Sequence, residues 1–269
     1  MPFGFAHRVR RHAPLVDLSL LLLLLGGLSG AGCRGDGEPP AGTASAREDV
    51  SRQSATVSEA GPSEPEAPPA ARDGRPVVVF LGDSLTAGYG LAEEQAWPAV
   101  LEERFAEEGV AFRAVNAGVS GDTSAGGLRR LDWVLRTRPD VVVVELGANE
   151  GLRGLELGPV EENLRQVVRR SGEAGARVLL VGLRIPPNYG PDYTRRFAEI
   201  YPRVAAELGV PLVPFLLEGV GGEPSLNLGD GVHPNVEGHR RVAGVVAPHL
   251  RPLVEAAAEA PAGAAAGGS

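Results

Sequence analysis

The stretch VVVFLGDSLT at residues 77–86 decides the fold class. It begins with five apolar residues and turns polar only at its end. A strand that is apolar throughout is typical of a parallel sheet covered on both faces, because a strand with one wet face alternates. Similar runs occupy residues 141–146, 112–115, 178–181 and 211–215. We therefore expect five strands.

Helical patterns separate these runs. They predict helices near residues 95–108, 123–136, 159–174 and 192–208, and a last helix from Pro234 to about residue 250, since proline suits a first helical turn. Alternating strands and helices indicate an α/β domain with three α/β/α layers around a doubly wound, flavodoxin-like parallel sheet of five strands. Ligands of such sheets bind beyond the carboxyl ends of the strands, so the functional residues should follow the strands.

Composition excludes several classes of protein. All 26 basic residues are arginine, so a phosphate loop ending in Gly-Lys, a pyridoxal Schiff base and a Ser/Lys dyad are ruled out. The single cysteine, Cys33, can form neither an intramolecular disulfide nor a thiolate cluster for zinc or iron–sulfur. A formal charge of −8 argues against nucleic acid as a partner. Small molecules or acyl substrates fit better.

The first 32 residues have the pattern of an export signal peptide. Arg8, Arg10 and Arg11 precede a leucine-rich run at 18–28, and small residues follow at 30–32. The uncharged stretch is shorter than the roughly 20 residues of a spanning helix, which makes a permanent transmembrane segment the weaker reading. Cys33 then stands where it resembles the acylated cysteine of bacterial lipoproteins, although Gly30 replaces the usual leucine of that motif. The alternative is an ordinary cleaved signal that leaves a free thiol.

Residues 34–75 have only Val50 and Val57 as large aliphatics and contain no aromatic residue. Such a stretch cannot bury enough apolar surface to fold. We expect a lipidated Cys33 and a disordered linker at 33–75, a working domain at 76–254 and a disordered Ala/Gly-rich tail at 255–269. The protein should be exported and should face the periplasmic side of the cell envelope, held to a membrane by its N-terminal lipid.

Four loops at the expected strand ends hold chemistry-bearing residues. Ser84 follows the first strand, Gly121 the second and Asn149 the third, while Asp230 and His233 precede the last helix. A serine hydroxyl becomes a nucleophile when an imidazole accepts its proton, and the imidazole needs an acceptor on its other nitrogen. Ser84, His233 and Asp230 fit these roles.

In these four motifs, taken in order, the chain resembles the SGNH (GDSL-type) hydrolases, above all the bacterial thioesterase I, lysophospholipase and arylesterase group. The resemblance spans residues 76–254. It implies a triad of Ser84, His233 and Asp230, and an oxyanion hole made by the backbone N–H groups of Ser84 and Gly121 and the side-chain amide of Asn149. It further implies a serine hydrolase of acyl esters or thioesters that uses no metal and no cofactor. The chain departs from the family at Glu150, where aspartate is usual.

Each assignment has a plainer alternative. Asp83 and Ser84 could only cap a helix, and Asp230 could do the same. Gly121 could be a turn residue with positive φ, and Asn149 could only bond a loop. In the proline-rich loop at 183–189, Ile185, Pro187 and Tyr189 are placed to wall an acyl pocket or to form a rigid turn that packs on the sheet.

We expect a monomer acting on a small acyl ester or thioester. Two other functions stay open: an envelope carbohydrate O-deacetylase on the same scaffold, and a non-catalytic surface binding module. Labelling of an activated serine and a comparison of acetylated sugars with long-chain acyl esters would separate the three.

Overall fold

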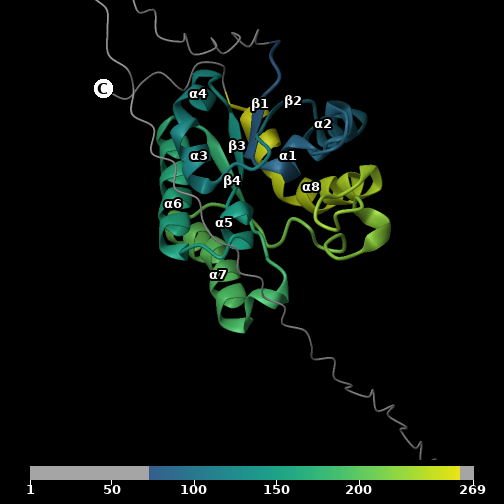
Figure 1. Cartoon of the computed structure of the whole chain (residues 1–269). Coiled ribbons are helices and arrows are strands. Elements are labelled where there is room, and N and C mark those ends of the chain that lie inside the picture. Colours follow the sequence, from purple (N-terminus) through teal and green to yellow (C-terminus); the bar gives the residue numbers. More distant parts are fainter. Residues whose placement is uncertain (1–72, 261–269) are drawn as a thin grey trace, which may run out of the picture. The chain divides into compact units, whose positions relative to one another are not determined.

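The computed structural model describes residues 73–260 and shows a five-stranded sheet between two layers of helices (Figure 1). The strands are β1 (Val77–Gly82), β2 (Arg113–Gly118), β3 (Val141–Glu145), β4 (Arg177–Val181) and β5 (Leu212–Val213). They pair in the order β2-β1-β3-β4-β5, and every pair is parallel. The expected doubly wound, five-stranded α/β/α fold is confirmed.

The sheet register brings the ends of three strands together. Gly82, the last residue of β1, pairs with Gly118 of β2 on one side and with Glu145 of β3 on the other. Because β1 lies between β2 and β3, the loops that follow these three strands start side by side.

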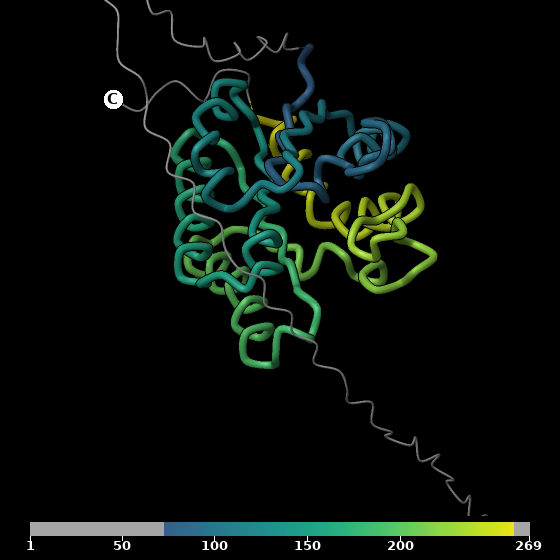
Figure 2. Tube along the Cα trace, in the orientation of Figure 1, coloured from purple at the N-terminus to yellow at the C-terminus, as the bar shows by residue number. Residues whose placement is uncertain are grey.

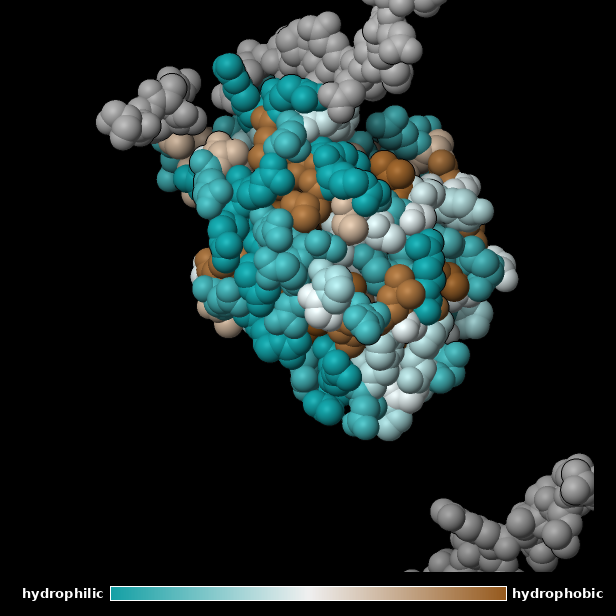
Figure 3. All heavy atoms as spheres, turned by 60° about the vertical axis from the view of Figure 1, so that its left-hand side comes forward, coloured by the Kyte–Doolittle hydropathy of each residue, from teal (hydrophilic) through white to brown (hydrophobic). Residues whose placement is uncertain are grey.

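Helices cover the two faces of the sheet. On one face, α2 (Trp97–Glu107) packs beside α8 (Val236–Ala258), although they come from opposite ends of the domain (Figure 2). On the other lie α3 (Ser124–Arg129), α4 (Leu131–Arg136), α6 (Leu157–Glu173) and α7 (Pro191–Leu208). The outer surface of this second layer is largely hydrophilic (Figure 3). Short helices α1 (Ser84–Ala87) and α5 (Ala148–Leu152) start at the carboxyl ends of β1 and β3.

The core explains the all-apolar strand pattern. Every residue of β1 and β3 is buried. Phe80 of β1 meets Trp97 of α2 edge to face, with ring centroids 4.9 Å apart, and Phe105 meets Phe112 in the same way. These contacts anchor α2 on the sheet, because aromatic pairs add attraction to the area they bury.

Two helices and the C-terminal tail differ from the sequence expectation. The helix expected at 123–136 is two helices, α3 and α4, that meet at Arg130. The last helix begins at Val236 and not at Pro234, because the Asn235 side chain accepts from the N–H of Gly238 and caps it. The same helix continues to Ala258, so a disordered tail from residue 255 is wrong for its first four residues.

Residues 1–72 and 261–269 lie outside the described part of the chain, and with them the expected signal peptide, Cys33 and nearly all of the linker. Among the helices of residues 73–260, none is both long enough and apolar enough to span a bilayer.

Candidate active site

The turn from β1 into α1 exposes Ser84 at the carboxyl edge of the sheet. The carboxylate of Asp83 caps α1 by accepting from the N–H of Leu85 at 3.0 Å. Gly82 has no room for a side chain: a Cβ would lie 2.1 Å from Thr86 Oγ1 and 2.6 Å from Glu145 Oε2. Glycine is therefore required for the chain to turn this tightly above a buried carboxyl group.

Ser84, His233 and Asp230 form one hydrogen-bonded chain. His233 Nε2 lies 2.9 Å from Ser84 Oγ, and His233 Nδ1 lies 2.7 Å from Asp230 Oδ2. The other oxygen of Asp230 accepts from the backbone N–H groups of Val232 and His233, at 2.9 and 3.0 Å. These hydrogen bonds lower the pKa of Asp230 to about 2, and the bond from the backbone N–H of His233 contributes most to this shift. A permanently charged Asp230 thus orients an imidazole that can take the proton of Ser84.

Asn149 lies near the start of α5 and points its amide toward the same turn. Its Nδ2 donates to the carbonyl of Asp122 at 2.8 Å and to Asp83 Oδ2 at 3.3 Å. Gly121, beside Asp122, has a φ of 81° and is exposed. The positive φ is compatible with the alternative interpretation of Gly121 as a turn residue. The loop that carries Gly121 is bonded directly to Asn149 through Asp122.

Arg130 ties these loops together. Its guanidinium donates to the carbonyls of Ala117 and Gly82, at 2.6 and 3.0 Å, and forms an ion pair with Asp122 at 2.7 Å. One side chain therefore holds the ends of β1 and β2 and the loop of Gly121. Sequence reasoning missed it, because nothing in its surrounding sequence distinguishes it from the other arginines.

Three carboxyl groups are buried beneath the site: Asp83, Glu145 and Glu150. Glu150 Oε1 accepts from the backbone N–H and the hydroxyl of Ser124, at 2.7 and 2.6 Å. The longer side chain at position 150 therefore makes its own supporting bonds, to the first residue of α3. Asn163 completes the group by donating to the Ser124 hydroxyl at 3.0 Å.

The proline-rich loop lies against α5. Ile185 is buried, and its Cγ2 would lie 2.8 Å from a Cβ at Gly151. The Tyr189 hydroxyl donates to the carbonyl of Leu152, and Pro187 is exposed. The loop thus packs on the helix that carries Asn149. Sequence reasoning missed another aromatic residue, Tyr89, whose ring lies on that of His233 with centroids 4.5 Å apart.

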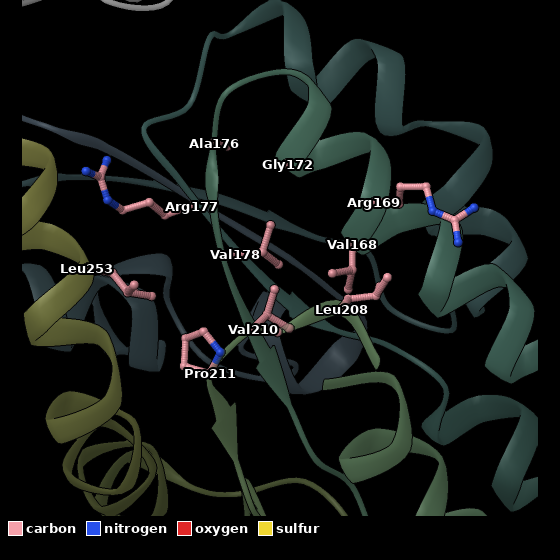
Figure 4. Close-up of a pocket in the computed structure, with 11 residues that line it drawn as sticks. Val168, Arg169, Gly172, Ala176, Arg177, Val178, Leu208, Val210, Pro211 and Leu253 are labelled. Atoms are coloured by element: carbon pink, nitrogen blue, oxygen red, sulfur yellow. The ribbon is translucent and has the colours of Figure 1, made fainter. Parts of the chain in front are cut away.

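Two pockets in the described chain lie away from Ser84. One of about 480 Å³ lies where β4 and β5 begin, between α6 and Leu253 of α8 (Figure 4). The other, of about 740 Å³, lies beside the edge strand β2 and is lined by Trp133 and several arginines. Neither is lined by Ser84 or His233. Within residues 73–260, no group of three or more His, Cys, Asp or Glu side chains is arranged to hold a metal ion.

Comparison with known proteins gives consistent matches. The sequence profile of the GDSL-like Lipase/Acylhydrolase family matches residues 80–241. Esterase TesA of Pseudomonas aeruginosa is 46% identical over 178 residues, which are 66% of this chain and 89% of that protein. Thioesterase 1/protease 1/lysophospholipase L1 of Escherichia coli is 43% identical over 66% of this chain and 84% of its own length. The crystal structure of TesA superposes with a TM-score of 0.64 at 46% identity, over 66% of this chain and 99% of that one.

Proposed function

The chain belongs to the GDSL-like lipase/acylhydrolase family of SGNH ester hydrolases, and from this premise we propose that it cleaves acyl esters or thioesters with Ser84 as nucleophile. The observation that carries the proposal is the chain of hydrogen bonds from Ser84 through His233 to Asp230. No other serine of the described residues has a hydrogen bond to a histidine ring.

The proposed reaction has two halves. Ser84 Oγ attacks the acyl carbonyl while His233 Nε2 accepts its proton, and Asp230 stabilises the resulting imidazolium. The tetrahedral intermediate collapses to an acyl-serine, and His233 gives the proton to the leaving alcohol or thiol. Water then attacks the acyl-serine while His233 takes a proton from it. The second tetrahedral intermediate collapses, His233 passes this proton to Ser84 Oγ, and the carboxylic acid leaves.

The developing oxyanion would receive hydrogen bonds from the backbone N–H groups of Ser84 and Gly121 and from Asn149 Nδ2. The geometry at Asn149 supports this role. Its bond to the Asp122 carbonyl is short and fixes the amide, whereas its bond to Asp83 is long enough, at 3.3 Å, to be given up to substrate.

For the substrate we propose acyl esters and thioesters, in keeping with the esterase and thioesterase names of the two relatives. The acyl part would contact the loop of Ile185, Pro187 and Tyr189, because that loop adjoins the helix of Asn149. We propose no metal or cofactor for this reaction, since the three oxyanion donors already polarise the carbonyl.

A fluorophosphonate probe tests the nucleophile. The full-length protein should gain one covalent adduct, located on Ser84 by peptide mass spectrometry, and Ser84→Ala should gain none. A panel of p-nitrophenyl esters, acyl thioesters and acetylated sugars then defines the substrate. An unlabelled wild-type protein would overturn the proposal, and turnover of acetylated sugars alone would replace it with a deacetylase.

We also propose that the chain is exported and acylated at Cys33, with residues 33–75 as a tether. The support is the sequence alone: a basic start, a leucine-rich run, and a sole cysteine before a stretch poor in large apolar residues. Intact-mass measurement of the membrane fraction tests this. A free thiol in a soluble protein would contradict it.

A further inference from the structure

We propose that Glu145 is a positioning residue for this hydrolysis: protonated, it donates to the Asp83 carboxylate and so holds the Ser84 turn and the Asn149 amide in place. The inference rests on the proposed function, because it assigns a role beneath the same nucleophile. It concerns a residue of β3 that touches no substrate, so Glu145 is not itself catalytic.

The sheet register places Glu145 beneath the turn that carries Ser84. It is the last residue of β3 and pairs with Gly82 of β1. Its Oε2 accepts from the Thr86 hydroxyl at 2.7 Å and from the backbone N–H of Asp83 at 3.3 Å. Glu145 therefore contacts the residues on both sides of Ser84, while its own side chain is only 1% exposed.

Glu145 and Asp83 lie against each other, since Glu145 Oε2 accepts from the backbone N–H of Asp83, and Asp83 is also only 1% exposed. Two ionised carboxylates at this place would repel each other, and neither has a hydrogen to donate to the other. One proton between them turns the repulsion into a short hydrogen bond. Burial supports this state, since it raises the pKa of both carboxyl groups.

The neighbouring groups do not neutralise the pair in any other way. Arg130 reaches the Gly82 carbonyl, but its ion pair is with Asp122. The Tyr201 hydroxyl donates to the Leu146 carbonyl. Glu150 adds a further acidic group, and both ring nitrogens of His233 are bonded to Ser84 and Asp230. Among the described residues, no arginine or histidine forms an ion pair with either carboxyl group of the pair.

The hydrogen-bond pattern assigns the proton to Glu145. Asp83 accepts from two N–H donors, Leu85 on one oxygen and Asn149 on the other, which favours the ionised form. Glu145 Oε1, by contrast, is buried and accepts a hydrogen bond from no donor among residues 73–260. A proton on Glu145 gives this carboxyl group a donor as well as an acceptor, and Asp83 is the acceptor within reach.

For hydrolysis, the consequence is that the Asp83 side chain is held in one position. Asp83 caps the helix that starts at Ser84, and before substrate binds it also accepts from the amide of Asn149, so a fixed Asp83 holds the nucleophile and keeps one proposed oxyanion donor turned toward the site until that bond passes to the substrate. Without Glu145, the Asp83 carboxylate would keep only its bonds from Leu85 and Asn149, and its side chain could rotate away from the position that it has in the structure. Transition-state stabilisation should suffer more than ground-state binding, because both groups act on the reacting carbonyl.

The test compares Glu145→Gln with Glu145→Leu in the full-length enzyme. Glutamine can still donate to Asp83 and accept from Thr86, so kcat should stay within about threefold of wild type. Leucine has a similar size and no polar atom, and kcat should fall by about 10- to 100-fold with little change in KM, as expected when a bond to a charged group is lost.

Infrared spectroscopy of the unliganded protein gives a second readout. Wild type should show the carbonyl stretch of a buried protonated carboxyl group, and Glu145→Gln should lose it. The matched control is Glu150→Gln, which removes the neighbouring buried carboxyl group and should keep the band.

A missing band in wild type, a band that survives Glu145→Gln, or a Glu145→Leu enzyme with wild-type kcat overturns the inference. If Glu145→Leu does not fold, the band and the kcat of Glu145→Gln decide alone. The band does not depend on the role of Ser84, so full activity of Ser84→Ala would reject the proposed function while leaving the carboxyl pair to be judged by its spectrum.

Discussion

Tyr89 lies over the imidazole of His233, with the ring centroids 4.5 Å apart and the two planes inclined by 35°. His233 is held at both nitrogens by Ser84 and Asp230, so the tyrosine restricts the remaining freedom of the ring, its rotation out of that line. In the proposed mechanism His233 becomes an imidazolium, and a cation over an aromatic face is attracted to it.

Tyr89→Ala should therefore lower kcat by about two- to fivefold, the equivalent of a cation–π contact of about 0.5–1 kcal/mol at an exposed site. Steady-state kinetics on one p-nitrophenyl ester measures the effect. Tyr89→Phe keeps the ring and should retain wild-type kcat. Equal losses in both variants would show that the hydroxyl, and not the ring face, matters.

Asn149→Ala should lower kcat by about 10²–10³, the usual loss for one oxyanion donor, with a much smaller change in KM. The reason is that the amide is needed when charge develops on the carbonyl oxygen. Kinetics on a rapidly and a slowly hydrolysed ester checks that the chemical step is affected. An unchanged kcat would mean that Asn149 serves only the Asp122 and Asp83 bonds.

The sequence predicts the sheet well because its central strands are buried on both faces and read as unbroken apolar runs. It also predicts which loops meet, since parallel strands end at one edge. It does not predict that residues 148–152 form the short helix α5, because so short a segment carries no periodicity.

The supporting residues of the site are harder to predict than the proposed triad. Glu145 looks like the polar end of an apolar strand, and only the register with Gly82 shows that it lies beneath Ser84. Tyr89 is one of the most exposed large hydrophobic residues, so nothing in its local pattern links it to His233 more than 140 positions away. Such contacts depend on tertiary packing and have no short-range signal.

His239 should make the stability of the fold depend on pH. Its Nδ1 accepts from the N–H of Trp97 at 3.1 Å, and its Nε2 is buried with no partner in the described chain. Burial lowers its pKa to about 4. The unfolded chain binds a proton below about pH 6.5 and the folded chain only below about 4, so the free energy of unfolding falls by about 3 kcal/mol as pH falls between the two.

Urea unfolding at several pH values measures this slope. His239→Asn keeps an acceptor for Trp97 and cannot titrate, so the free energy of unfolding should fall less steeply on acidification than in wild type. Asp83 and Glu145, with raised pKa values, act in the opposite direction and cannot supply this fall. Parallel pH profiles for variant and wild type would assign the dependence to other groups.

Glu150→Asp should destabilise the fold by about 1–3 kcal/mol, the cost of leaving buried donors without an acceptor. The shorter carboxylate would withdraw from the N–H and hydroxyl of Ser124. Chemical denaturation measures the loss. The matched control is Glu162→Asp on the exposed face of α6, where the change should stay within about 0.5 kcal/mol. A Glu150→Asp protein as stable as wild type would mean that the backbone of α5 adjusts to restore the contact.

If Ser84, His233 and Asp230 form a triad, the losses in kcat caused by replacing its members should not be additive. Ser84→Ala and His233→Ala should each lower kcat by about 10⁴-fold or more, and the double variant should be no more than about threefold worse than either, because a base without its nucleophile has no proton to accept. The kcat of wild type, the two single variants and the double variant, measured with the same ester, completes this double-mutant cycle. Additive losses would show that the two residues act in separate steps.

Asp230 gives an independent check on the same residues. Its pKa is lowered to about 2 by the bonds it receives from His233 and Val232, so Asp230 stays ionised at neutral and mildly acidic pH, and protonation of this carboxylate should contribute nothing to the pH dependence of hydrolysis in that range. Asp230→Asn removes the charge that orients the imidazole, and kcat should drop by about 10⁴-fold at neutral pH, because the ring then takes the wrong tautomer. A kcat equal to that of wild type would remove Asp230 from the triad and leave it as a turn residue that bonds Val232 and His233.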